Sequence, residues 1–235
     1  MIGKITEKWA QSIELPCIYI SPIQSTNTYA KELAEIPESR LLILTDQQTH
    51  GRGRNTNTWQ QENPGRALLS SWCFQIHRFP QATITCRVGL ALYESLKKNW
   101  PHLKWSIKAP NDLYLDEKKV AGILVELVQT ESAYSLIIGI GINVLESPTS
   151  INTATSIYHN DDLIFEEKIW HQFLSQFYYR LQSLFTNVSD SLSELEIEKL
   201  LEALNQFPLL TEKYIGLDTN GTLKTNSKTI LWSEL

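Results

Sequence analysis

The chain has 235 residues, of which 42% are hydrophobic and 20% are charged, and its formal net charge is −5. These values are typical of a globular protein of one or two domains, and the acidic balance argues against a general nucleic-acid-binding surface. No run of 18 apolar residues occurs and the N-terminus lacks a secretory signal pattern, so the sequence predicts neither a membrane span nor export. The three cysteines lack metal-ligand spacing and are interpreted as reduced thiols, which favours a cytoplasmic location.

The first 144 residues predict a sheet with helices at its sides. Pro16 and Pro22 interrupt a helix near the N-terminus, and the 24 residues before Ser25 leave too little room for a three-helix DNA-binding module. A helix capped by the polar residues 25–27 is expected to run to Glu35. Apolar runs and periodicity predict strands at 18–20, 40–45, 67–76, 103–108, 113–115, 119–128 and 134–144, and a helix at 82–98.

The C-terminal part predicts two helices and a small β appendage. Apolar residues recur about every four positions in 161–185, and 191–205 begins with a serine and is rich in Glu and Leu. In the segment 214–235 apolar and polar residues alternate, and Asp218–Gly221 predicts a hairpin turn. The expected fold class is α+β, with a mixed, mainly antiparallel sheet flanked by helices.

The segment after the strand at 40–45 alternates two glycines with two arginines: Gly51, Arg52, Gly53 and Arg54. Glycine lets the backbone approach a ligand closely, and arginine supplies permanently charged, forked donors that suit phosphate. A merely solvated turn is the plain alternative, and short Arg-Gly runs also occur in disordered nucleic-acid tails. The position between two strands favours an anion-binding loop.

A second charged block surrounds the strand at 113–115. Asp112 at the entrance of this strand either caps a turn or holds Mg²⁺ through an oxygen atom. Lys119 is followed by the small residues Ala121 and Gly122, which leave space for a ligand. No P-loop and no nucleophile beside a base are evident, so the sequence predicts a site that binds and stabilises negative charge.

Five blocks resemble, in order, the motifs of the biotin protein ligase family, in a short form without an N-terminal DNA-binding domain. They are Ser25–Asn27, Gln48–Arg54 with Trp59, Lys108–Leu113, Lys119–Glu126 and Gly139–Val144. Ala109 stands where the family has a tryptophan, and the C-terminal SH3-like domain is shortened. The resemblance implies a class II synthetase-like catalytic domain over 1–188, and a linker helix with a reduced SH3-like domain over 189–235.

The resemblance also implies an ATP-dependent biotin ligase that forms biotinyl-5′-AMP, releases pyrophosphate and then transfers biotin to a lysine of a biotin carboxyl carrier protein. The implied catalytic residues are Lys119, Arg54 and Asp112, with Mg²⁺ on Asp112. The implied residues for biotin and adenylate are Ser25, Thr26, Asn27, Gln48, Gly51, Arg52, Gly53, Arg54, Trp59, Lys108, Asn111, Lys119, Gly122, Ile123, Leu124 and Asn143.

Three other functions remain as alternatives. A lipoate ligase or octanoyl transferase would share the fold, but its Arg-Arg-x-Gly-Gly-Gly and His-Asp blocks are not found in the sequence. A transcriptional repressor would need a DNA-binding module, and we expect no DNA partner. A non-catalytic biotin-binding module would fit Ala109 and the short tail, and the oligomeric state is left open between monomer and homodimer.

Overall fold

The computed structural model describes residues 1–33, 39–131, 133–159, 163–186 and 191–235. The chain divides into two compact units. The first unit consists of Met1–Pro80 and Val120–His171, and the second consists of Gln81–Lys119 and Gln172–Leu235. Each unit is built from segments that are distant in the sequence.

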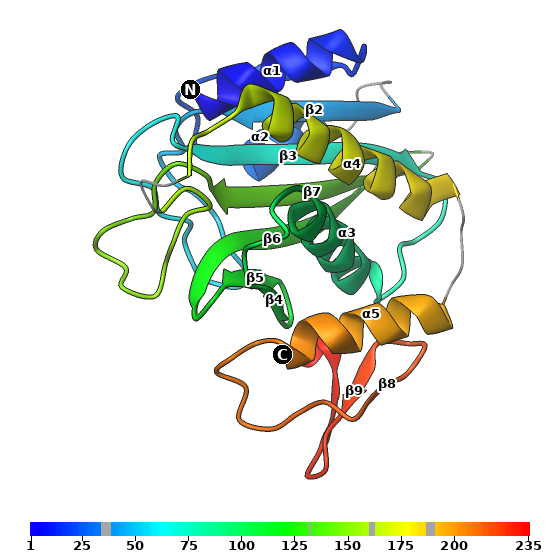
Figure 1. Cartoon of the computed structure of the whole chain (residues 1–235). Helices are drawn as coiled ribbons and strands as arrows, with labels where there is room; N and C mark the ends of the chain where they lie inside the picture. Colours follow the sequence, from blue (N-terminus) through cyan, green and yellow to red (C-terminus); the bar gives the residue numbers. More distant parts are fainter. Residues whose placement is uncertain (34–38, 132, 160–162, 187–190) are drawn as a thin grey trace. The chain divides into compact units, whose positions relative to one another are not determined.

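The first unit is built on a mixed, mainly antiparallel sheet, as the sequence predicts. Its strands are β1 (Cys17–Tyr19), β2 (Arg40–Thr45), β3 (Ala67–Ile76), β6 (Lys118–Gln129) and β7 (Tyr134–Asn143). Their order is β1-β2-β3-β7-β6, in which only β1 and β2 are parallel (Figure 1). Apolar residues predominate in β2 and β3, because both strands are buried almost along their whole length.

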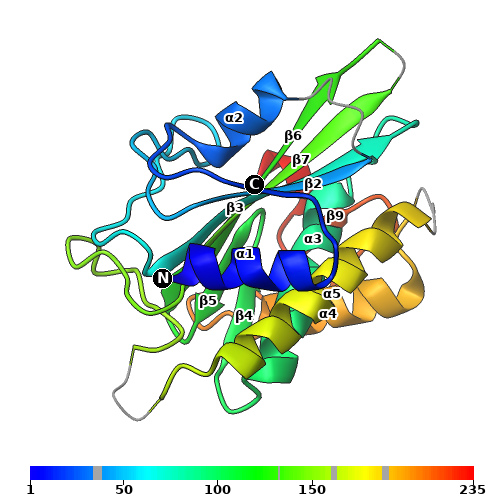
Figure 2. The same cartoon turned by 90° about the horizontal axis from the view of Figure 1, so that it is seen from above.

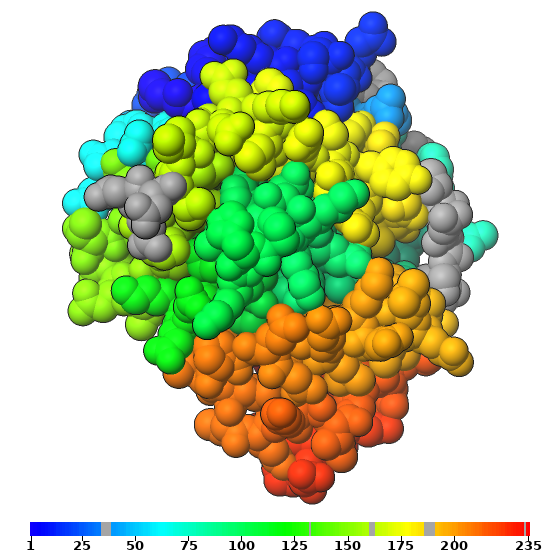
Figure 3. Space-filling model, viewed as in Figure 1, coloured from blue at the N-terminus to red at the C-terminus, as the bar shows by residue number. Residues whose placement is uncertain are grey.

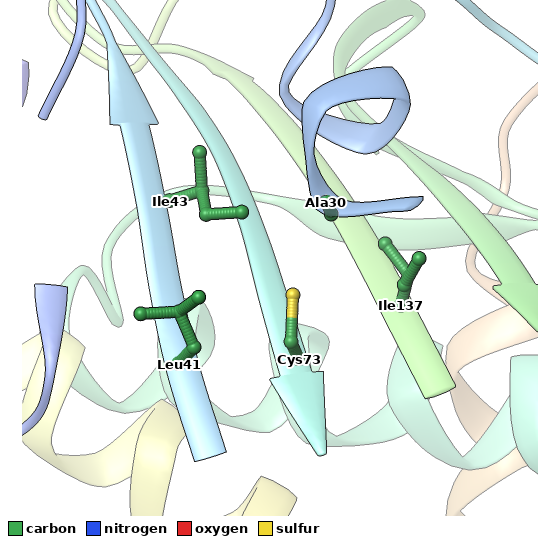
Figure 4. Packing of buried hydrophobic residues seen from close by; sticks show 5 residues of the cluster. All are labelled: Ala30, Leu41, Ile43, Cys73 and Ile137. Carbon is green, nitrogen blue, oxygen red and sulfur yellow. The ribbon is translucent and has the colours of Figure 1, made fainter. Parts of the chain in front are cut away.

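Helices α1 (Ile2–Ser12) and α2 (Thr26–Glu32) lie on opposite faces of this sheet (Figure 2). On one face, a buried cluster joins α2 to three strands (Figure 4), and its members are Ala30, Leu41, Ile43, Cys73 and Ile137. On the other face, Trp9 of α1 contacts Trp72 of β3 edge-on, with ring centroids 6.0 Å apart. Side chains alternate across a strand, so adjacent residues Trp72 and Cys73 serve the two different cores.

Sequence analysis missed helix α1. The prolines that were expected to interrupt a helix lie beyond its last residue, Ser12. Ile2, Thr6, Trp9 and Ala10 are buried, and this spacing is that of one helix face. The helical periodicity of the first dozen residues was therefore a usable signal.

The second unit contains α3 (Ile84–Asn99), the antiparallel strands β4 (Trp105–Lys108) and β5 (Asp112–Leu115), most of α4 (Glu167–Thr186), and α5 (Glu194–Asn205). The Glu94 carboxylate of α3 joins the three helices, because it pairs with Arg180 of α4 and, at 2.5 Å, with Lys199 of α5. The aromatic rings of Trp100 and Phe173 lie 5.6 Å apart in the same core.

A small antiparallel sheet closes the second unit. It consists of β8 (Gly216–Leu217), β9 (Thr222–Lys224) and β10 (Thr229–Leu231), followed by a short 3₁₀ helix, η1 (Trp232–Glu234). The predicted β appendage and its turn are thus confirmed, with Gly221 at φ +88° in the turn. Figure 3 shows the surface of residues 194–235, orange to red, as continuous from α5 to these strands.

All four predicted helices differ from the predictions at a boundary: α2 ends at Glu32 rather than at Glu35, and α3 begins at Ile84 rather than at 82. The long helix begins at Glu167 rather than at 161, and Ile164, which the periodicity counted as apolar face, is 80% exposed. Helix α5 begins after Ser193, whose side chain accepts from the backbone N–H of Glu196 while the Glu196 carboxylate accepts from the backbone N–H of Ser193. The predicted domain boundary at 188–189 lies outside the described residues and stays a prediction. Among the helices that the structure describes, none is long and apolar enough to cross a membrane.

Candidate functional site

The start of α2 contacts Gln48, and both belong to the predicted site. The Ser25 hydroxyl is the N-cap of the helix and accepts from the Thr28 N–H. The side-chain oxygen of Gln48 accepts from the Thr26 backbone N–H at 2.8 Å and from the Thr26 hydroxyl at 3.3 Å. Polar groups from two segments 22 residues apart therefore converge at the N-terminus of one helix.

Asn27 is held inside the fold by three strands. Its amide nitrogen donates to the Leu124 carbonyl at 3.2 Å and to the Glu126 carboxylate at 2.9 Å, while its oxygen accepts from the Ser71 hydroxyl at 2.5 Å. The side chain sits so close to Gly139 that a Cβ there would lie 2.4 Å from the Asn27 amide oxygen. Asn27 is 3% exposed, so it orients the start of α2 from within.

The Arg-Gly segment is a loop, as predicted, but its own backbone hydrogen bonds close it. Trp59 donates its N–H to the Gly51 carbonyl at 3.0 Å, Gly53 donates to the Asn57 carbonyl at 2.8 Å, and Arg52 forms a β-bridge with Thr58. A Cβ on Gly51 would lie 2.5 Å from the Trp59 carbonyl oxygen. The first glycine of the motif is therefore required by this closure.

The closed loop rests on β7 through Trp59. The indole lies against Gly141, where a Cβ would come within 2.8 Å of the Trp59 ring. Gly141 pairs with Gly122 across β7 and β6, so two glycines face each other at this position. The close approach of the Trp59 indole explains why β7 has a glycine at position 141.

The guanidinium of Arg52 turns toward the sheet. Its two terminal nitrogens donate to the two oxygens of Glu126 at 3.0 and 2.8 Å. Lys31 of α2 donates to the same carboxylate at 2.6 Å. Sequence analysis assigned no role to Glu126, although a lone charge between the apolar residues Val125 and Leu127 was a visible signal.

We expect acidification to weaken this cluster. Burial raises the pKa of Glu126, but hydrogen bonds from Lys31, Asn27 and Arg52 outweigh burial and lower the pKa below its ordinary value of 4.5. A carboxyl group with a lowered pKa stabilises the fold above its unfolded pKa and loses that contribution as the pH falls through the folded value. Between about pH 5 and about pH 3, the free energy of unfolding should therefore fall more for the natural chain than for Glu126→Gln, which cannot titrate. Urea unfolding at both pH values checks this, and equal losses would contradict it.

In the second unit, the other predicted charged residues lie at the end of β4 and at the starts of β5 and β6. Lys119 Nζ lies 2.7 Å from Asp112 Oδ1, and both side chains are partly exposed. The Lys108 ammonium lies 5.5 Å from the ring centroid of Tyr114 and 5.9 Å from that of Phe207. The structure thus brings Asp112 and Lys119 together and directs Lys108 onto two aromatic rings.

Trp232, which sequence analysis did not single out, holds the same turn. Its indole N–H donates to the Pro110 carbonyl at 2.7 Å, one residue before Asn111, and the ring is 2% exposed. Its backbone N–H donates to Gly221 of the β8–β9 turn at 3.0 Å. No local pattern indicates this contact, because 122 residues separate the two partners.

Asp112 is the residue predicted to hold Mg²⁺. Within the described part of the chain, no three His, Cys, Asp or Glu side chains gather in a group that could hold a metal ion. The single carboxylate therefore fits a cation that also takes oxygens from a bound nucleotide, and it does not form a cage made of protein alone. The predicted residue Asn143 is 4% exposed, and its amide donates to the Thr155 carbonyl at 3.0 Å.

Comparisons with known proteins place the chain in a family. The family model described as the biotin/lipoate A/B protein ligase family matches residues 19–143, more than half of the chain. The bifunctional ligase/repressor BirA of Bacillus subtilis (strain 168) is 36% identical over 137 residues, which cover 56% of this chain and 41% of that protein. Biotin–protein ligase 1, chloroplastic, of Arabidopsis thaliana is 30% identical over 175 residues, or 69% of this chain and 46% of that protein.

Solved structures extend the similarity beyond the matched segment. A biotin protein ligase from Aquifex aeolicus in complex with biotin and ATP superimposes with a TM-score of 0.71 at 25% identity, covering 93% of this chain and 97% of that chain. Against the curated relatives, in contrast, the alignments span less than half of the relatives' own length.

Proposed function

Because this chain belongs to the biotin/lipoate A/B protein ligase family, we propose that it is an ATP-dependent biotin–protein ligase. Biotin is activated to biotinyl-5′-AMP, and the biotinyl group then passes to one lysine of a biotin carboxyl carrier protein. The observation that carries the proposal is the convergence of three motif segments in the first unit: the start of α2, Gln48 and the Arg-Gly loop. The similar Aquifex aeolicus structure contains biotin and ATP, which supports both as substrates.

The first step needs no nucleophile from the protein. A biotin carboxylate is ionised near pH 7, so its oxygen can attack the α-phosphorus of ATP while the bond to the leaving pyrophosphate breaks. Two anions must be brought together, and the chain's task is to position them and offset their charge. In this proposal Arg54 and Lys119 offset the charge of the carboxylate and the α-phosphate. Asp112, with Asn111, would hold Mg²⁺, which would supply further positive charge to the nucleotide phosphates.

The second step transfers the acyl group. The ε-amine of the carrier lysine attacks the biotinyl carbonyl, AMP leaves with the bonding pair, and the new amide loses a proton. Ser25, Thr26 and Gln48 are proposed to bind the ureido end of biotin throughout, with Trp59 packed against the closed loop. The reduced thiols support a cytoplasmic location for this chemistry, and their pKa values, raised to about 12 by burial, make them poor nucleophiles.

Ligation of a purified carrier domain tests the proposal directly. The chain is incubated with biotin, ATP and Mg²⁺, and biotin on the carrier lysine is measured by mass spectrometry. A parallel reaction with lipoate in place of biotin distinguishes a biotin ligase from a lipoate ligase. Biotin binding without ATP-dependent transfer would instead identify a non-catalytic biotin-binding module.

Replacing Arg54 with glycine is expected to release the activated intermediate. An acyl-adenylate is labile in water, and loss of the second loop arginine removes a group that retains and shields it. We expect Arg54→Gly to biotinylate bystander proteins that the natural chain leaves unlabelled. The measurement is labelling of serum albumin in the presence of biotin and ATP, with Arg66→Gly as the control arginine outside the loop. Unchanged selectivity would reject the shielding role.

A further inference from the structure

The Glu126 carboxylate of β6 receives donors from both segments that are proposed to bind biotin. Arg52 of the Arg-Gly loop donates to both carboxylate oxygens, at 3.0 and 2.8 Å. Asn27 and Lys31 of α2 donate at 2.9 and 2.6 Å. One side chain thus joins two segments that lie 74 and 99 residues away in the sequence.

We infer that Glu126 is a positioning residue that tethers the Arg-Gly loop to the start of α2, and that Arg52 acts through this tether rather than by contacting the ligand. The inference rests on the proposed function, because it assigns how the biotin end of that site is held. The anion-binding role within the loop falls to Arg54.

The geometry distinguishes this cluster from an ordinary surface ion pair. An isolated exposed pair contributes little, because water screens it and two long side chains lose freedom. The Glu126 side chain is only 15% exposed, and its pairing with Arg52 is bidentate, which is the stronger and more directional arrangement. Several donors stabilise a carboxylate that is this little exposed, so removal of its charge weakens all of these hydrogen bonds together.

The tether has a consequence for binding. The loop contacts the sheet through Trp59 and through Arg52, and the second contact fixes the backbone between Gly51 and Arg54. A loop that is ordered before the ligand arrives loses less conformational freedom on binding. Without the tether, the ligand itself must order the loop, and the affinity for biotin falls.

Limited trypsin digestion of the whole chain tests the tether without any ligand. Trypsin cuts after arginine, so peptides ending at Arg52 and Arg54 report directly on opening of the loop. We expect Glu126→Gln to raise the rate of these cuts about tenfold, the scale for losing hydrogen bonds to a charged group. The matched control is Glu146→Gln, which removes an exposed carboxylate that pairs with Arg66 at 2.8 Å in the same unit. No change in Glu126→Gln, or the same rise in the control, would overturn the tether.

Biotin titration by calorimetry tests the positioning role. We expect the dissociation constant of biotin to rise about tenfold in Glu126→Gln, with the KM for ATP unchanged, because only the biotin end is loosened. Arg52→Lys keeps the charge but not the bidentate geometry, so we expect a smaller rise in the dissociation constant of biotin. This second variant keeps the test decisive if Glu126→Gln fails to fold. Faster cutting with unchanged biotin affinity would overturn the positioning role. A natural chain without affinity for biotin would reject the proposed function, and the digestion would still decide the tether.

Discussion

Replacing Lys119 with alanine is expected to lower the rate of biotinyl-adenylate formation at least about 100-fold, the scale for losing one donor that stabilises the transition state. Lys119 lies 2.7 Å from Asp112, so its ammonium is held next to the carboxylate that is proposed to hold Mg²⁺. In the proposed mechanism, removal of the ammonium takes away positive charge where negative charge develops on the α-phosphate. It also removes the ion-pair partner of the Asp112 carboxylate, which would disturb the proposed cation site as well.

Pyrophosphate release in a single turnover with biotin and ATP measures this effect. The control is Lys118→Ala, which removes the exposed lysine one position earlier on β6. Adjacent residues of a strand point to opposite faces, so the control removes the same charge without approaching Asp112. A normal rate in Lys119→Ala would reject its catalytic assignment, and an equal loss in Lys118→Ala would indicate a general electrostatic effect.

Adding one methyl group at Gly139 is expected to lower the free energy of unfolding by about 3 kcal/mol, the upper end for overpacking a buried site. The new Cβ would lie 2.4 Å from the Asn27 amide oxygen, closer than real Cβ atoms come to their neighbours. Asn27 would have to move, and with it the hydrogen bonds to Ser71, Leu124 and Glu126. Because Asn27 follows the cap of α2, biotin affinity is expected to fall together with stability.

Urea unfolding and biotin titration of Gly139→Ala check this prediction. Gly216→Ala is the matched control, since a Cβ there would lie 3.7 Å from its nearest neighbour, an ordinary contact distance. Combining Gly139→Ala with Asn27→Ala removes the clash and should recover part of the lost stability but not the biotin affinity. Full stability of the single variant would show that β7 moves to accommodate the methyl group.

The strands were predictable from the sequence where burial governs the pattern. β2 and β3 have the predicted bounds, because both strands are buried on both faces and are therefore rich in apolar residues. The long helix was predicted six residues too early, because periodicity alone cannot distinguish an exposed isoleucine such as Ile164 from a buried one. The apolar spacing of α1 is present in the sequence, and Pro16 and Pro22 lie beyond the last residue of this helix, so they do not interrupt it.

The candidate site was predictable where its residues are close in sequence or belong to a motif. The contact between Thr26 and Gln48 and the pair of Asp112 with Lys119 join residues that the motifs had already grouped. The carboxylate of Glu126 and the indole of Trp232 were not assigned, because their partners lie about 100 residues away and only the tertiary fold brings them together.

The hydrogen bond from the Trp232 indole to Pro110 has a practical implication for handling the protein. Trp232 supports the turn that bears Asn111 and Asp112 although 122 residues separate the indole from Pro110, so a variant library designed to improve expression should leave Trp232 unchanged.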